Sequence, residues 1–246
     1  MILEKYSASG NDFLIFHAFN RFNFFALARK LCSRDYIGAD GLVILLPSRY
    51  YAYEWAFYNS DGSMASMCGN ASRCAAHYAL NNKLAKRKHI FLSGAGPIEA
   101  LVTRDIVEIN FGRVKIVKED ILDSGMEFTL LDSGVPHLIH FGDNELLNIE
   151  MDLMKYLRSK YNANITFANI KNRKLISLFT YERGVEGITK SCGTGAAGVF
   201  YLAYTNNMVD NHAFLIPPIG EKLEFWIVND EVHYKGRVLK IASLVI

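Results

Sequence analysis

Two cysteines in matching contexts are the residues best suited to do chemistry. Cys68 follows a polar turn and precedes an alanine-rich stretch of helical character, and Cys192 precedes a second stretch of small and apolar residues. A helix N-terminus carries unpaired N–H groups and a partial positive charge, which stabilise a thiolate and bind a carboxylate. The repeat predicts two reactive thiols. One could take a proton from one face of an anionic substrate while the other delivers a proton to the opposite face.

The elements that must position these cysteines repeat along the chain. Hydrophobic spacing predicts helices over 24–32, 69–81, 149–160 and 196–204, with Asn23 as the N-cap of the first. Both halves then have the order strand, helix, strand, strand, cysteine, helix, strands. This order predicts two similar lobes with the site between them, a usual location for small-ligand clefts.

Composition indicates a globular protein. The chain has 246 residues, of which 50% are hydrophobic and 21% charged. Its net charge of +2 gives no electrostatic reason to expect a nucleic-acid or membrane partner. The N-terminus lacks a basic region followed by a long apolar run, so we expect no signal peptide and a cytoplasmic location.

The other two cysteines are interpreted as packing residues. Cys32 lies in an apolar helical pattern, and Cys74 lies beyond the first turn of the helix that Cys68 opens. No two cysteines form a C-x-x-C pair, which argues against zinc, and a disulfide framework is not expected without an export signal. We therefore expect no metal and no disulfide.

Several short motifs resemble those of the diaminopimelate epimerases, a family of pyridoxal-phosphate-independent amino-acid epimerases. They occur in the order of that family and span nearly the whole chain. The motifs are Gly10-Asn11-Asp12-Phe13, Asn59-Ser60-Asp61-Gly62-Ser63, Met67-Cys68-Gly69-Asn70, Gly134-Val135-Pro136-His137, Asn162-Ala163-Asn164, Tyr181-Glu182-Arg183-Gly184 and Ser191-Cys192-Gly193-Thr194-Gly195.

The resemblance implies an α+β fold of two pseudosymmetric lobes, each a mixed, mostly antiparallel sheet wrapped around a central helix, with the active site in the cleft between them. The lobes would be 1–112 and 113–236, with a final strand, 237–246, returning to the first. It also implies an isomerase that converts LL-2,6-diaminopimelate to the meso form without a cofactor, in bacterial lysine and peptidoglycan precursor synthesis, and that works as a homodimer.

The same resemblance assigns roles to individual residues. Cys68 and Cys192 would be the acid–base pair, and His137 would tune or relay their protonation. Glu182 would hold the substrate ammonium, and Arg183 would bind a carboxylate with its guanidinium fork. The remaining substrate contacts would be Asn11, Asn59, Gly69, Asn70, Asn164, Gly193 and Thr194.

Three departures from the family pattern leave substrate choice open. Val135 stands where many members have Asn, Gly41 where many have Gln, and Ala71 where many have Gly. One alternative therefore keeps the chemistry and changes the substrate, to another amino acid or a small acid. An alternative of another class is a non-catalytic ligand-binding protein or a thiol redox protein.

Overall fold

The computed structural model describes residues 2–142 and 150–246. Its contacts divide the chain into two compact units, one formed by residues 1–110 with 235–246 and the other by residues 111–234. Among the described residues, each unit combines a mixed β-sheet with two helices, so the predicted α+β class is confirmed.

The first unit wraps a sheet around helix α2. The pairings β1–β2, β3–β4 and β5–β6 are antiparallel, and β2–β3 and β4–β5 are parallel. The last strand of the chain, β17, pairs antiparallel with β1. The elements are β1 (Ile2–Ala8), β2 (Asn11–His17), α1 (Phe25–Cys32), β3 (Gly41–Leu46), β4 (Glu54–Asn59), α2 (Gly69–Asn81), β5 (Lys88–Ser93), β6 (Gly96–Thr103), β7 (Ile106–Gly112) and β17 (Leu239–Val245).

The second unit repeats this plan around helix α4. The pairings β9–β10, β11–β12 and β14–β15 are antiparallel, and β10–β11 and β12–β14 are parallel. The elements are β8 (Lys115–Asp123), β9 (Met126–Asp132), β10 (Pro136–Phe141), α3 (Met151–Tyr161), β11 (Asn164–Asn172), β12 (Leu175–Glu182), β13 (Gly187–Ile188), α4 (Gly193–Thr205), β14 (His212–Ile216), β15 (Leu223–Val228) and β16 (Glu231–Arg237).

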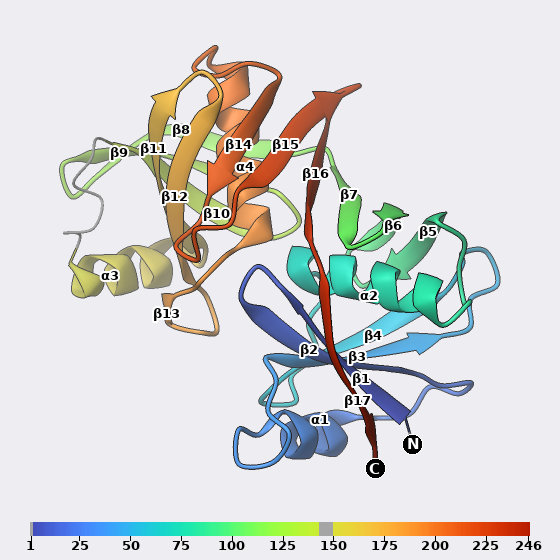
Figure 1. Cartoon of the computed structure of the whole chain (residues 1–246). Helices are drawn as coiled ribbons and strands as arrows, with labels where there is room; N and C mark the ends of the chain where they lie inside the picture. The colour runs from blue at the N-terminus through green and yellow to red at the C-terminus, as the bar shows by residue number, and fades with distance from the viewer. Residues whose placement is uncertain (1, 143–149) are drawn as a thin grey trace. The chain divides into compact units, whose positions relative to one another are not determined.

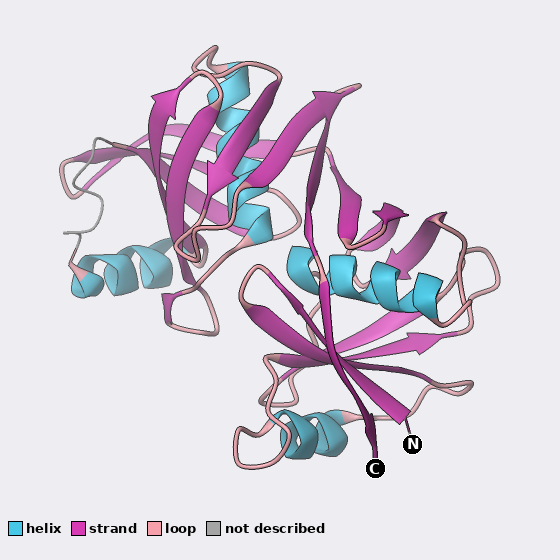
Figure 2. Cartoon of the chain, in the orientation of Figure 1, coloured by secondary structure: helices cyan, strands magenta, loops and turns pink. Residues whose placement is uncertain are grey.

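The central helices are built for burial. In α2 the alanines and Cys74 are fully covered by the sheet, and α4 is apolar on nearly all faces. A helix that is apolar all round must lie in a core, and Figure 2 shows α4 with strands packed along it. Within the described part of the chain, no helix is both long and apolar enough to cross a membrane.

Several predicted boundaries need correction. Helix α2 covers the residues predicted for it, but α1 begins at Phe25. Its N-cap residue is Phe24 and not Asn23 as predicted, although the side chain of Asn23 accepts the N–H of Phe25 at 3.0 Å. Helix α3 begins at Met151, and Ile149 lies outside the described residues.

The sequence indicates a polar, glycine-containing turn over residues 7–11, but Asn11 is the first residue of β2. The turn is shorter than this, because Ser9 and Gly10 alone connect the strands, with φ of 48° and 83°. A two-residue hairpin turn of the primed type requires such positive φ values. The strand β8 was not predicted at all, since its side chains are mostly charged and exposed.

Candidate active site

Both cysteines occupy the N-cap position of a central helix. Cys68 precedes α2 with extended backbone angles (φ −155°, ψ 120°), and Cys192 precedes α4 in the same way (φ −122°, ψ 109°). The first intrahelical bonds run to their own carbonyls, from Ser72 N–H at 2.9 Å and from Ala196 N–H at 3.0 Å. The N–H groups of the first turn are therefore not used inside either helix. The prediction that each cysteine opens a helix is confirmed.

The two sulfur atoms have different surroundings. Cys68 is half-buried, and its Sγ accepts the N–H of Ala71 at 3.5 Å. Cys192 is 9% exposed, and its Sγ lies 3.4 Å from the hydroxyl oxygen of Thr194. A helix N–H and a hydroxyl can each donate to a thiolate, so both sites can stabilise the charged form of the cysteine.

Asn70 and Asn11 form a chain of hydrogen bonds beside Cys68. Asn70 Nδ2 donates to Asn11 Oδ1 at 2.8 Å, and Asn11 Nδ2 donates to Asp40 Oδ2 at 2.9 Å. Arg73 Nη2 donates to Asn70 Oδ1 at 2.7 Å, which fixes the orientation of both amides. The structure therefore brings together two predicted substrate contacts, Asn11 and Asn70, at the start of α2.

Charged residues hold this chain at both ends. Arg73 is fully buried and also donates to Ser9 Oγ at 2.6 Å. At the other end, Arg34 bonds to both Asp12 and Asp40. Burial acts to raise the pKa of Asp12, but hydrogen bonds from Arg34 and Lys5 outweigh it and lower that pKa below its usual range.

His137 lies behind the start of α4. Its ring is fully buried, with Nδ1 3.0 Å from Thr166 Oγ1 and Nε2 3.0 Å from Thr194 Oγ1. Burial, with a smaller contribution from the charge of Arg183, lowers the pKa of His137 to about 3. The imidazole is therefore neutral at physiological pH and cannot act as a cationic acid. It can act on Cys192 through Thr194.

Asn164 and Arg183 are bonded within their own unit. Asn164 Oδ1 accepts the N–H of Arg183 at 2.8 Å, and its Nδ2 donates to the carbonyl of Pro136 at 3.2 Å. The guanidinium of Arg183 donates to the carbonyl of Asn162 at 3.0 Å. Asn164 thus connects the start of β10 to the residue that follows β12, a structural role in addition to the substrate contact predicted for it.

The remaining predicted residues lie at element ends. Asn59 ends β4, is exposed, and donates from Nδ2 to Ser63 Oγ at 3.0 Å. Glu182 ends β12, and its carbonyl accepts the N–H of Glu186 at 2.8 Å. Gly193 and Thr194 form the first turn of α4, where backbone N–H groups bind anions.

The structure shows the surroundings of two of the residues that depart from the family pattern, Gly41 and Ala71. A Cβ at Gly41 would stand 2.6 Å from the ring of Phe57 and 2.8 Å from the carbonyl of Tyr58, so a larger side chain does not fit this backbone. Ala71 is fully buried in the first turn of α2. Its N–H is the donor to Cys68.

Some residues of this site were missed at the sequence level. Arg73 carried a signal, because it is the only charged side chain in α2. Thr166 and Thr180 carried none, since their hydroxyls sit 3.1 Å apart in strand interiors that read as core.

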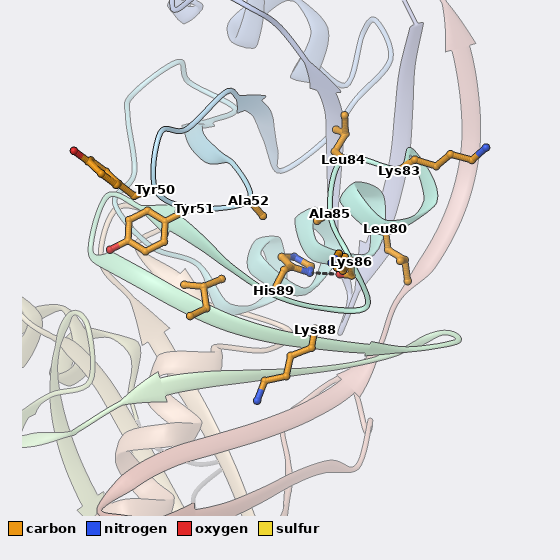
Figure 3. Close-up of a pocket in the computed structure, with 11 residues that line it drawn as sticks. Tyr50, Tyr51, Ala52, Leu80, Lys83, Leu84, Ala85, Lys86, Lys88 and His89 are labelled. Carbon is orange, nitrogen blue, oxygen red and sulfur yellow. Dashed lines mark hydrogen bonds between the residues drawn. The ribbon is translucent and has the colours of Figure 1, made fainter.

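A surface pocket lies apart from these residues. It measures about 700 Å³ and contains none of the predicted site residues. Figure 3 shows its lining: Tyr50, Tyr51, Ala52, Leu80, Lys83, Leu84, Ala85, Lys86, Lys88, His89 and Ile90. No thiol or carboxylate lines it, so it offers none of the acid–base groups expected for the reaction.

The cysteines at Cys32 and Cys74 are structural. Both are buried, and burial raises the pKa of the Cys32 thiol to about 12 and raises that of Cys74 further. Among residues 2–142 and 150–246, no group of three or more His, Cys, Asp or Glu side chains is arranged to hold a metal ion.

The fold is shared with solved epimerases and racemases. A hydroxyproline epimerase from Agrobacterium vitis superposes with a TM-score of 0.76 at 14% identity, covering 99% of this chain and 91% of that one. A predicted epimerase from Pseudomonas aeruginosa gives 0.78 at 13% identity, covering 100% and 98%. At such identities the likeness concerns the fold alone.

Sequence comparison gives the family. The model for diaminopimelate epimerase matches residues 3–117. A diaminopimelate epimerase from Nitratiruptor sp. is 46% identical over 98% of this chain and 96% of its own length. One from Campylobacter jejuni subsp. doylei is 44% identical over 97% and 96%. The chain belongs to the diaminopimelate epimerase family, and it is an isomerase.

Proposed function

We propose that this protein epimerises LL-2,6-diaminopimelate to the meso form by two-base chemistry at Cys68 and Cys192. The observation that carries this proposal is that each cysteine caps the central helix of one of two units with the same strand pairing. This arrangement supplies two thiols, each at the N-terminus of a central helix, as a reaction on the two faces of one α-carbon requires.

In the proposed step, the thiolate of one cysteine removes the α-proton. The electron pair of the broken C–H bond is left on the α-carbon and delocalises into the carboxylate, where negative charge grows. The thiol of the other cysteine then gives its proton to the opposite face. The cysteines end with their protonation states exchanged, and the enzyme must reset them before the same reaction repeats.

The backbone N–H groups of Gly69, Asn70, Gly193 and Thr194 suit the growing charge on that carboxylate. Such donors are preorganised because the helices fix them, so they cost no reorganisation during the reaction. Asn11 and Asn70 already have fixed amide orientations, and we assign them to substrate binding.

The distal half of the substrate carries a second ammonium and a second carboxylate. We assign this distal end to polar contacts with Asn59 and Asn164. The substrate ammonium is assigned to Glu182, which we count among the catalytic residues, and a carboxylate is assigned to Arg183. Asn164 Oδ1 accepts the backbone N–H of Arg183, so replacing Asn164 is expected to disturb the position of Arg183 as well. We further propose a cytoplasmic homodimer that needs no cofactor.

The test is proton NMR of LL-diaminopimelate in D2O under reducing conditions. Wild-type protein should remove the α-proton signal, and Cys68→Ala and Cys192→Ala should each lower the rate by at least roughly 10²-fold, the usual minimum for a general acid or base. Cys74→Ala is the matched control, because it removes a buried thiol from α2 and should keep the rate.

Meso product formed at the wild-type rate in either site variant would overturn the two-base assignment. No exchange with the wild-type protein would overturn the substrate. A survey of other amino acids and small acids would then identify the alternative substrate. A thiol redox protein would instead show turnover through a disulfide cycle.

A further inference from the structure

The hydroxyl of Thr194 links two groups whose hydrogen bonds can be assigned. It lies 3.4 Å from Cys192 Sγ and 3.0 Å from His137 Nε2. A hydroxyl has a single proton to donate. It can therefore donate to the imidazole or to the sulfur, but not fully to both.

The amide of Asn164 decides which nitrogen of His137 carries the proton. Its Oδ1 accepts a backbone N–H and its Nδ2 donates to a backbone carbonyl, so the amide cannot be flipped without losing both bonds. The group that faces His137 Nε2, at 3.3 Å, is therefore the N–H of Nδ2. Nε2 must be the acceptor, and Nδ1 carries the proton and donates to Thr166 Oγ1.

The tautomer then fixes Thr194. With Nε2 as an acceptor, the hydroxyl donates to it and presents its oxygen to Cys192, where the S–H of a neutral thiol can donate. A thiolate has no proton to give, and it needs a donor. The same hydroxyl can supply one if it rotates from Nε2 to Sγ.

The backbone keeps these groups at this separation. Ser133 Oγ donates to the carbonyl of Thr194 at 2.8 Å. A Cβ at Gly195 would stand 2.7 Å from Thr180 Oγ1 and 3.0 Å from His137 Cε1, so only glycine lets the helix start this close to the cluster.

We propose that Thr194 is a positioning residue whose hydroxyl switches between His137 and Cys192 as the cysteine gains or loses its proton. Neutral His137 competes for the hydroxyl and favours the thiol, and donation from Thr194 to Sγ favours the thiolate. The pair thereby sets how readily Cys192 changes between base and acid. The inference rests on the proposed function, because it assumes that Cys192 changes protonation state during turnover.

The test reads the thiol directly and needs no substrate. In a Cys68→Ala background, the rate of iodoacetamide alkylation at Cys192 is followed against pH by peptide mass spectrometry. Thr194→Val removes the donor with little change of shape, and the midpoint of the profile should rise by roughly one pH unit, about a tenfold smaller thiolate fraction at neutral pH.

Three further variants make the result specific. Thr194→Ser keeps the hydroxyl and should restore the wild-type midpoint. Thr205→Val, the same change at the last residue of α4, should leave it in place. His137→Phe removes the competitor, and the midpoint should fall, opposite in sign to Thr194→Val.

Thermal unfolding of each variant shows that it is folded. Equal midpoints for wild type and Thr194→Val, or a shift that Thr194→Ser does not restore, would overturn the proposal. A shifted midpoint in a protein that does not act on diaminopimelate would contradict the proposed function alone.

Discussion

The starts of α2 and α4 present a cysteine at the same position and support it by different means. Cys68 receives a helix N–H from Ala71, a donor that cannot turn away. Cys192 lies beside the Thr194 hydroxyl, a donor that can rotate. Equivalent positions in a duplicated fold therefore do not give equivalent thiols, and the two directions of the reaction need not use their cysteines alike.

The layers behind the two helices differ in the same way. A buried arginine, Arg73, holds the start of α2 through Asn70 and Ser9. The start of α4 rests on neutral groups, the imidazole of His137 and the hydroxyls of Thr166 and Thr180. A charged anchor is rigid but costly to disturb, whereas neutral hydroxyls can exchange partners at low cost.

The largest expected difference follows from removing each anchor. Arg73→Met leaves Asn70, Ser9 and the carbonyl of Arg237 without their donor, and it should lower the free energy of unfolding by about 3–5 kcal/mol. Thr180→Val breaks one hydroxyl contact and should cost about 1 kcal/mol. Urea unfolding followed by circular dichroism measures both. Similar losses in the free energy of unfolding for the two variants would contradict the proposed difference between a charged and a neutral anchor.

Acid should affect the second unit more steeply than the first. The pKa of His137 is lowered to about 3 by burial, from an ordinary value of 6.5. Between these pH values, His137 is therefore protonated in the unfolded chain but neutral in the folded protein. The free energy of unfolding should fall as pH drops below 6.5, by up to about 1.4 kcal/mol per pH unit.

The first unit should respond less steeply, because burial lowers the pKa of His77 and of His89 by less than that of His137, and its paired carboxylate responds only at lower pH. Asp12 has a lowered pKa, so its contribution is present above its ordinary value of 3.8 and is lost as pH falls through the depressed one. Each unit contains one tryptophan, Trp55 or Trp226, so Trp226→Phe and Trp55→Phe report on one unit each. Between pH 6.5 and 4 the Trp226 signal should weaken more than the Trp55 signal, and His137→Phe should remove this difference. Equal responses of the two tryptophans would contradict this.

The smallest effect is expected at Ala71. Ala71→Gly introduces the residue that many family members carry, keeps the N–H that donates to Cys68, and should cost about 0.5–1 kcal/mol of stability through backbone entropy. The rate of α-proton exchange in diaminopimelate should stay within about twofold of the wild-type rate. Losing the N–H donor would raise the pKa of Cys68 by about one unit and change the thiolate fraction about tenfold, but Ala71→Gly keeps that donor. A much larger rate loss would mean that the side chain at this position, as well as its N–H, supports the thiol.

The sequence predicted the parts of this molecule that local pattern controls. Helix α2 was predicted to the residue, because a small-residue helical stretch follows Cys68 directly. Strand β8 was missed, because an exposed, charged strand pairs through its backbone and leaves no hydrophobic alternation. The two-residue turn at Ser9 and Gly10 depends on φ values that Ser rarely adopts, so Asn11 was assigned to the turn.

The candidate site also combines features that follow from local sequence with features that depend on long-range contacts. The helix-capping cysteines and their first-turn glycines could be predicted from spacing alone. The contact between His137 and Thr194 joins residues 57 positions apart, and it depends on strand register and on the close approach of Gly195. No local pattern encodes such a contact. The roles of Asn59, Glu182 and Arg183 toward the substrate stay predictions.

The central claim, two different proton donors on two faces, is tested most directly by where deuterium enters at early conversion. LL-diaminopimelate is incubated with the wild-type protein in D2O. The remaining substrate and the meso product are then separated, and the deuterium content of each is measured by mass spectrometry. Two bases predict one deuterium in the product and almost none in the remaining substrate, because the thiol that returns a proton to the original face keeps the substrate's own hydrogen. Equal deuterium in substrate and product from the first time points would contradict it, since a single exchanging base would then serve both faces.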